Sequence, residues 1–424
     1  MAVGVATAKD ATFRAPAVAV GRRLVSEAVW HDDRCTWFGD DVEDDGAVIH
    51  RSLAADLYGG TSGVAWSLAH LYAATGDDDV AATAAGALRH ALSRTRGPTD
   101  AGLYTGTSGI ALAAVAAGRL IGAPDITEEG SRLAHTAARS AVEAPSDETD
   151  LIGGIAGTAL ALLELSRALD DDALLDAAGT LGEHLLTRAR AEASATLTQP
   201  RLCGLGHGAS GAALALLELD VALDDPRFVD AACAELAYER SWFSREHGNW
   251  PDLRELDGAK LEEGGRPGYP VYWCHGAAGI GLVRLRAYAH TGDEVWLAEA
   301  AAAIDTASAA MLRVVTLPGG APTGLDLTLC HGVGAVAELH LVAAETTGDE
   351  EHLEHARRLV RLAVSGRDAG DNELLLPDDI PCGVPGGGET TGLMVGLAGI
   401  GALLLRLEDP AAAPSPALVA GWAR

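Results

Sequence analysis

One arrangement of small and apolar residues recurs along the chain. A turn with paired glycines leads into an apolar, helix-forming run, as in YGGTSGVAWSL at Tyr58 and IGGIAGTALAL at Ile152. The arrangement occurs seven times, at intervals of 46 to 68 residues, and self-similarity of this kind is the signature of a repeat architecture. The leading glycines, called register glycines below, are Gly60, Gly106, Gly154, Gly208, Gly276, Gly332 and Gly396. A second glycine follows three residues later, except in the sixth copy, which has Ala335.

The interval between repeats predicts two helices in each unit, because helices average about 11 to 12 residues. The first helix, as in GTALALLEL, is apolar around its whole circumference and is expected to be buried on both sides. A polar break such as TGDDD or LDDD follows, and then a second helix with a charged face, as in DDALLDAAGTLGEHLLTRA. Each unit is therefore predicted to be a hairpin of one inner and one outer helix.

Seven such hairpins could form an open solenoid or a closed ring. The irregular intervals and the lack of polar end repeats favour closure, because the end units of an open array need polar outer faces. We predict an all-α fold, an α/α toroid of seven helical hairpins, formed by residues 51–424 as a single domain. Residues 1–50 are expected to be an extension that packs on the toroid. The longest connection, between Gly208 and Gly276, is rich in aromatic and helix-breaking residues and is expected to cover one mouth of the ring.

Composition excludes several classes of function. Hydrophobic residues make up 48% of the chain, which is enough for a large core. The formal net charge of -29 repels phosphate backbones and anionic lipids, so nucleic acid is not an expected partner. No charged leader precedes an apolar segment, and no uninterrupted apolar stretch of about 18 residues occurs, so we expect a cytoplasmic protein without membrane insertion. Six cysteines are too sparse for a disulfide scaffold and instead suggest metal binding or catalysis.

The repeat register brings the candidate chemistry together. Histidine stands immediately before the register glycine in the fourth, fifth and sixth units, as His207, His275 and His331. Cysteine precedes that histidine twice, as Cys274 and Cys330. Stacking equivalent turns would place these side chains at one rim of the ring, and thiolates with imidazoles are the ligands that zinc prefers. Four protein ligands would make a closed structural site and three an open one, and the spacing does not choose between them.

The order of these motifs, with GHG, then WCHG, then LCHG in seven glycine-turn hairpins, resembles the lanthionine synthetase C family from about Leu53 to Leu407. The stretches DLYGGTSG and WCHGAAGI look particularly like the cyclase domains of the two-function lanthipeptide synthetases. The resemblance implies an α/α toroid with a central zinc ion. Its ligands would be Cys274, Cys330 and His331.

The same resemblance implies roles for further residues. His207 would be the acid/base residue and Asp150 a second catalytic residue, while His275 would neighbour the metal without binding it. Some members carry a catalytic arginine ahead of the first zinc cysteine, and the nearest candidate here is Arg266, for which a surface ion pair is the competing interpretation. For Asp150 the competing interpretation is a helix N-cap.

The reaction that the resemblance implies is Michael-type addition of a peptide cysteine thiol to dehydroalanine or dehydrobutyrine, which forms lanthionine or methyllanthionine. Its substrate would be a dehydrated precursor peptide, supplied by a separate dehydratase. Two alternatives stay open: addition of glutathione or another thiol to dehydrated proteins, and a non-catalytic zinc-containing scaffold that binds peptides. An α/α-barrel carbohydrate enzyme would need opposed carboxylates, and the paired CHG turns argue against it.

Overall fold

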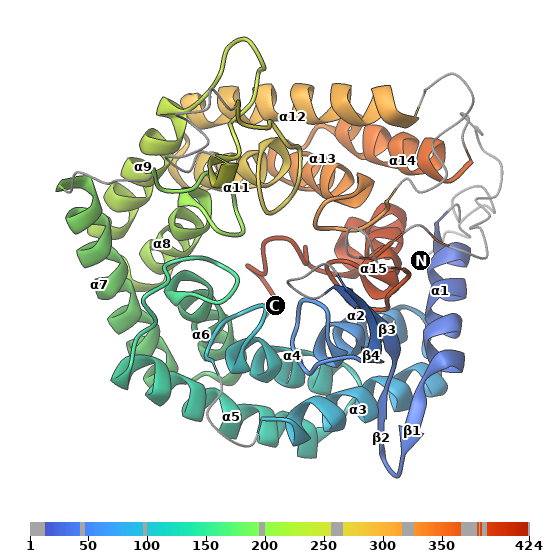
Figure 1. Cartoon of the computed structure of the whole chain (residues 1–424). Helices are drawn as coiled ribbons and strands as arrows, with labels where there is room; N and C mark the ends of the chain where they lie inside the picture. The colour runs from blue at the N-terminus through green and yellow to red at the C-terminus, as the bar shows by residue number, and fades with distance from the viewer. Residues whose placement is uncertain are drawn as a thin grey trace, which may run out of the picture.

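The computed structural model describes residues 13–42, 47–95, 100–194, 200–255, 266–315, 326–365, 380, 382–383 and 388–422. These residues form two concentric rings of helices, an α/α toroid, which confirms the predicted fold class (Figure 1). The inner helices are α2 (Thr61–Thr75), α4 (Thr107–Leu120), α6 (Ile155–Leu169), α8 (Ala209–Leu223), α11 (Ala277–Thr291), α13 (Val333–Thr347) and α15 (Leu397–Glu408). The outer helices are α1 (Arg14–Glu27), α3 (Asp78–Ser93), α5 (Pro124–Glu143), α7 (Asp172–Ser194), α9 (Pro226–Ser241), α12 (Glu294–Val315) and α14 (Glu350–Ser365).

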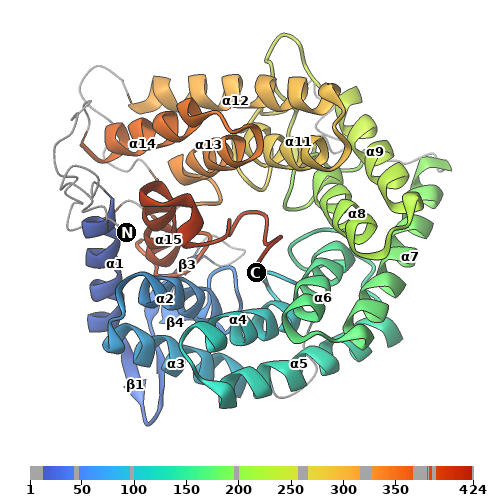
Figure 2. The ribbon, with the colours of Figure 1, turned by 180° about the vertical axis from the view of Figure 1, so that it is seen from behind.

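The seventh unit differs from the six before it in how its outer helix is supplied. In the first six units the outer helix follows the inner one along the chain, but the outer partner of α15 is α1, from the other end of the sequence (Figure 2). Glu408, the last residue of α15, accepts hydrogen bonds from the backbone N–H groups of Phe13 and Arg14 at 2.9 and 3.2 Å. The start of the described chain thus closes the outer ring, which a repeat read only in the forward direction does not predict.

Backbone hydrogen bonds join the seven glycine turns into a closed ring. In each turn the residue two or three positions before the register glycine donates its N–H to a carbonyl of the next turn, over 2.7–3.1 Å. The bonds run from Tyr58 N to Tyr104 O, Tyr104 N to Ile152 O, Leu151 N to Gly206 O, Gly206 N to Cys274 O, Trp273 N to Cys330 O, Cys330 N to Met394 O and Met394 N to Tyr58 O. Equivalent turns therefore meet at one end of the inner ring, called the rim below.

The second glycine of each repeat lets the inner helix start directly above its own turn. A Cβ at Gly109 would lie 1.7 Å from Leu103 O, and one at Gly157 would lie 1.9 Å from Leu151 O, so neither position has room for a side chain. The sixth unit carries Ala335 at this register, and there Gly334 makes the close approach, with a Cβ position 2.6 Å from Leu327 O. The repeat in the sequence thus records a packing requirement.

Two antiparallel ribbons follow α1. One joins β1 (Val29–His31) to β2 (Arg34–Thr36), and the other joins β3 (Phe38–Val42) to β4 (Val48–Ser52). The first ribbon packs on α3, where the Trp30 ring lies against Gly86. The expected extension of residues 1–50 therefore supplies one outer helix and both ribbons, while its first twelve residues lie outside the described part of the chain.

Three further segments complete the description. Two short 3-10 helices, η1 (Leu253–Glu255) and η2 (Pro410–Ala412), lie in the long fourth connection and after α15. The middle of that connection, residues 256–265, lies outside the described residues, so its predicted role as a cover over one mouth stays a prediction.

By length and composition alone, α12 could cross a membrane; in this fold it is the outer partner of α11 and buries Trp296, Ala300 and Ala303.

Candidate functional site

Two thiols from neighbouring turns meet at the rim. The Cys274 and Cys330 side chains are hydrogen-bonded to each other, and the Tyr58 hydroxyl donates a second hydrogen bond to Cys330 Sγ at 2.9 Å. The contact with Cys330 lowers the pKa of Cys274 to about 7, against the effect of burial. The contact with Cys274, together with burial, raises the pKa of Cys330. The two thiols therefore titrate as a pair, and the pair gives up its first proton more readily than a lone buried thiol would.

His331 is held from one side and bare on the other. Its Nδ1 is hydrogen-bonded to the Asp326 carboxylate, which also accepts hydrogen bonds from the backbone N–H and the hydroxyl of Thr328 at 2.7 and 3.0 Å. Its Nε2 is buried and has no hydrogen-bond partner among the described residues. A carboxylate on one imidazole nitrogen with the other nitrogen free is the arrangement that orients histidine ligands in metal sites.

These donors fit a zinc ion. Two thiols and an imidazole nitrogen are the soft sulfur and nitrogen ligands that zinc takes, and a buried nitrogen without a partner is costly unless something binds it. Within the described residues, no three His, Cys, Asp or Glu side chains lie close enough together to hold a metal ion without some movement. The two thiols are in contact, and the unpartnered nitrogen belongs to His331, the residue that follows Cys330 in the sequence.

The structure brings His207 and Asp150 into contact, although they come from different units. His207 Nδ1 lies 2.6 Å from Asp150 Oδ2, and the other carboxylate oxygen accepts the backbone N–H groups of Gly153 and Gly154 at 2.9 and 2.7 Å. Burial alone would raise the pKa of Asp150, but the hydrogen bonds from His207 and from the two glycines outweigh burial and lower it. The His207 side chain is 40% exposed, so a substrate can reach it.

A counterpart of Asp150 in another repeat shows which of its two contacts, with the turn glycines and with His207, is shared. Asp56 stands at the same register position in the first unit, and its Oδ1 accepts the backbone N–H groups of Gly59 and Gly60 at 2.8 and 3.2 Å. Burial raises the pKa of Asp56, the reverse of the direction at Asp150. Capping the glycine turn is therefore a shared structural task, and the contact with His207 is an additional feature of Asp150.

His275 lies between the two groups of side chains. Its ring stacks on His207 with centroids 5.6 Å apart and planes inclined at 20°. Its Nδ1 faces Cys203 O at 3.4 Å, and its buried Nε2 has no hydrogen-bond partner within the described chain. Burial, with a contribution from the charge of Arg254, lowers the pKa of His275 to about 4, so the ring is neutral near pH 7.

Sequence reasoning assigned no role to three residues that the structure places here: Tyr58, Asp326 and Arg254. Tyr58 occupies the register position of Cys274 and Cys330, so counting from the register glycine could have found it. Arg254 in η1 is paired with Asp252 at 2.6 Å, and its charge helps to lower the pKa of Cys274. No local sequence pattern marks Arg254 as a residue of the site. Arg266, the arginine that the sequence suggested, is exposed at the described edge of the same connection.

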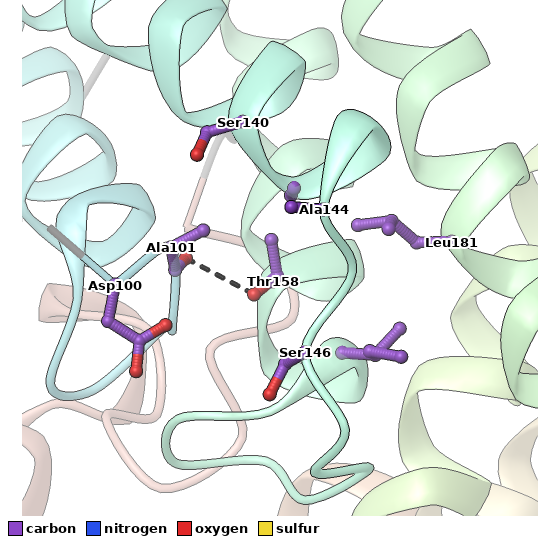
Figure 3. A pocket seen from close by; sticks show the side chains of 9 residues that line it. Asp100, Ala101, Ser140, Ala144, Ser146, Thr158 and Leu181 are labelled. Atoms are coloured by element: carbon purple, nitrogen blue, oxygen red, sulfur yellow. Dashed lines mark hydrogen bonds between the residues drawn. The ribbon is translucent and has the colours of Figure 1, made fainter. Parts of the chain in front are cut away.

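Two cavities flank the rim between consecutive outer helices. The first, of about 210 Å³, lies among α7, α8 and α9, and His207 lines it together with Arg188, Arg201 and Leu216. The second, of about 190 Å³, is lined by residues of α5, α6 and α7, and Figure 3 shows Asp100, Ser146 and Thr158 around it. Both cavities lie over the start of an inner helix, and the second has no histidine in its lining.

Comparisons with known proteins agree with this arrangement. The family model described as lanthionine synthetase C-like protein matches residues 51–419. Among solved structures, a nisin cyclase superposes with a TM-score of 0.57 at 17% sequence identity, covering 84% of this chain and 89% of that one, a likeness of fold. An α-1,6-mannanase of Salegentibacter gives a TM-score of 0.47 at 12% identity, covering 94% of this chain and 99% of the mannanase. With the family model spanning most of its length, this chain belongs to the lanthionine synthetase C-like protein family.

Proposed function

We propose that this protein is a zinc-dependent peptide cyclase that adds a cysteine thiol to dehydroalanine or dehydrobutyrine and forms lanthionine or methyllanthionine. The observation that carries the proposal is the meeting of two groups at one rim. His331, with its unpartnered nitrogen, directly follows Cys330 of the thiol pair, and the Asp150–His207 pair contacts the turn of Cys274 through the stacked ring of His275.

The metal role goes to Cys274, Cys330 and His331. A bound zinc ion lowers the pKa of a coordinated thiol and so supplies a thiolate at neutral pH. Asp326 holds Nδ1 of His331 and thereby keeps Nε2 as the ligand atom. Tyr58 donates its hydroxyl to Cys330 Sγ, which stabilises a thiolate on that sulfur. Three protein ligands leave a coordination position for the substrate sulfur.

The proton role goes to His207. Attack of the thiolate sulfur on the β-carbon forms the C–S bond, and the π electrons of the double bond move to the neighbouring carbonyl as an enolate. His207 then donates a proton to the α-carbon, replacing the proton lost from the thiol, so the peptide keeps its mass. Asp150 accepts the hydrogen bond from Nδ1 of His207, which fixes the tautomer and stabilises the charged ring. The amino ends of the inner helices converge at this rim, and their partial positive charge favours an enolate.

The proposed substrate is a dehydrated precursor peptide made by a separate dehydratase, and the proposed location is the cytoplasm. All six cysteines are free in the structure, as a reducing compartment requires.

The test is incubation of the zinc-loaded protein with a short peptide that contains one dehydroalanine and one cysteine. Cyclisation removes the free thiol without changing the peptide mass, and alkylation followed by mass spectrometry detects this. Asp150→Asn keeps an oxygen that can cap Gly153 and Gly154 but removes the charge beside His207, so cyclisation should fall at least tenfold. Asp56→Asn is the matched control and should leave the rate unchanged.

Equal rates in the two variants would reduce Asp150 to a turn cap. Addition of glutathione to the same dehydroalanine, without ring formation, would favour the alternative thiol transfer. A wild-type protein that binds zinc and the peptide but catalyses neither reaction would be a scaffold.

A further inference from the structure

The segment that follows α15 turns back into the middle of the inner ring. Residues 409–422, called the central segment below, begin at η2, and both views show the C-terminal end at the centre of the toroid (Figures 1 and 2). Most of its apolar side chains beyond Ala412 are buried, including Ala417, Val419 and Trp422. The interior of the ring is therefore filled by a part of the chain that belongs to none of the repeats.

The central segment is anchored on three inner helices, α15, α13 and α2. Arg406 Nη1 donates to Ala413 O at 2.6 Å, and the Ser415 hydroxyl donates to Glu338 Oε2 at 2.8 Å. Trp422 stacks on Trp66 with ring centroids 4.3 Å apart. These contacts fix the entry and the end of the segment, with residues 416–421 between them.

Between these anchors, the segment contacts the turn that carries the first thiol. Ala417 O accepts a hydrogen bond from Trp273 Nε1 at 2.9 Å. Trp273 is fully buried and directly precedes Cys274. Its backbone N–H donates to Cys330 O at 2.7 Å, so this residue also joins the two thiol-bearing turns.

A second chain of contacts leads to the other thiol. Pro416 O accepts a hydrogen bond from the Tyr104 hydroxyl at 2.8 Å. The Tyr104 ring meets the edges of Trp273 and Tyr58, with centroids 5.1 and 6.3 Å apart. Tyr58 in turn donates its hydroxyl to Cys330 Sγ. Two adjacent carbonyls of the central segment thus hold two aromatic side chains: Trp273, which directly precedes Cys274, and Tyr104, which contacts the ring of Tyr58 next to Cys330.

We infer that the central segment is a positioning element for the rim: the carbonyls of Pro416 and Ala417 hold Tyr104 and Trp273, and through them set the placement of Cys274 and Cys330. The zinc readout of this inference rests on the proposed metal site. Buried indole N–H and phenol groups need an acceptor, so without these carbonyls both rings would shift toward another one. Such a shift would move Cys274, which follows Trp273, and Cys330, which is bonded to the neighbouring Tyr58.

The experiment compares a chain truncated after Asp409 with the double variant Trp273→Phe/Tyr104→Phe. The double variant keeps an aromatic ring at each position and removes the two donors; the smaller ring at position 273 is matched by the same change in the control variant below. Zinc affinity, measured by competition with a chromophoric chelator, should fall 10- to 100-fold in each, the range found when groups that orient metal ligands are removed. Trp37→Phe is the matched control, because Trp37 Nε1 also donates to a buried carbonyl, Leu24 O at 2.8 Å, away from the thiols.

A second readout needs no metal. In the metal-free protein, the rates at which iodoacetamide alkylates Cys274 and Cys330, mapped by mass spectrometry, should change at least fivefold in both the truncated chain and the double variant. Combining the truncation with the double substitution should add nothing further, because both remove the same contacts.

Unchanged zinc affinity and unchanged alkylation in the double variant would overturn the inference, even if the truncated chain lost both. If the truncated chain does not fold, the double variant decides alone. If the wild type holds no zinc at the thiols, the proposed function fails, and the alkylation rates still test the positioning.

Discussion

Two histidines at one end of the inner ring and a buried arginine at the other differ in whether their nitrogen atoms have partners. At the rim, the Nε2 atoms of His275 and His331 have no hydrogen-bond partner in the described structure. At the other end, called the far mouth below, buried Arg406 is paired with Glu338 and Glu345 at 2.8 Å and also donates to Ala413 O. Leaving a buried polar group unpaired costs about 1–3 kcal/mol. The protein bears that cost at the two rim histidines, where the proposed metal ion and substrate would bind, and avoids it at Arg406, where the network holds the fold.

The same contrast appears in the open space at each end. The far mouth has a cavity of about 750 Å³, lined by Arg286, Glu345, Arg406 and the central segment. The arginines that line it are committed to carboxylates: Arg286 pairs with Glu218 at 2.5 Å. The far mouth therefore has a large cavity with paired charges, whereas the rim has small cavities and histidine nitrogens without hydrogen-bond partners. Four changes test the distinction, from the largest expected effect to the smallest.

His207→Ala should lower the cyclisation rate by about 10²–10⁴, the usual contribution of a general acid. The half-exposed side chain contributes little to packing, so the free energy of unfolding should change by less than about 0.5 kcal/mol. Peptide cyclisation and urea denaturation measure the two quantities. His184→Ala, on the exposed face of α7, is the control for both. A rate within a factor of three of wild type would remove His207 from the mechanism.

Arg406→Met should lower the free energy of unfolding and affect the cyclisation rate little, the reverse of His207→Ala. It leaves Glu338 buried without its partner, and breaking a buried ion pair in this way costs about 3–5 kcal/mol of folding free energy. Urea denaturation measures the loss. Arg89→Met, which breaks the exposed pair with Asp125, should cost less than about 1 kcal/mol. An equally small loss at Arg406 would show that the far-mouth network does not hold the fold.

His70 makes the stability of the far mouth depend on pH. Burial lowers the pKa of His70 to about 4, although a hydrogen bond to the backbone of Ala412 opposes the shift and the charge of Arg406 adds to it. The unfolded chain takes up a proton below about pH 6.5, and the native chain does so only near pH 4. Stability is therefore complete above pH 6.5 and falls by about 1.4 kcal/mol per pH unit between the two values.

His70→Gln removes this contribution. Its free energy of unfolding, measured in urea at pH 8, 6 and 5, should fall less steeply than that of the wild type below pH 6.5. Above pH 7 the two curves should run parallel, which serves as the internal control. Parallel curves at all three pH values would contradict the assignment to His70.

Ser415→Ala should produce the smallest effect. It removes two hydrogen bonds, one donated to Glu338, which keeps its pair with Arg406, and one accepted from the backbone N–H of Ala417 at 3.2 Å. The loss should be about 1–2 kcal/mol of folding free energy. Zinc affinity should stay at the wild-type value, because Pro416 and Ala417 keep their contacts with Tyr104 and Trp273. Equilibrium denaturation and chelator competition measure the two. A tenfold loss of zinc affinity would mean that the anchor itself, rather than the two carbonyls, positions the rim.

Much of the fold follows from local patterns in the sequence. The register glycines predicted the glycine turns because a side chain three residues later would collide with the backbone, as at Gly157, and that requirement leaves a second glycine in every unit but the sixth. The all-round apolar character of α6 and α8 predicted inner helices, since only a helix covered on both sides can bury so many apolar residues. The pairing of α1 with α15 left no such mark, because two helices that are far apart in the sequence meet only when the ring closes.

For the candidate site, the sequence alone determined which residue types share a register. His207, His275 and His331 stand one residue before their glycines, and Cys274 and Cys330 two before, so any fold that aligns the turns gathers them. Only the tertiary structure decided which partners each side chain has: Asp150 reaches His207, Asp326 holds His331, and Tyr58 donates to Cys330. The physical reason is that a register is a property of backbone packing within one repeat, whereas a side-chain contact depends on how different repeats, loops and the central segment meet around the ring.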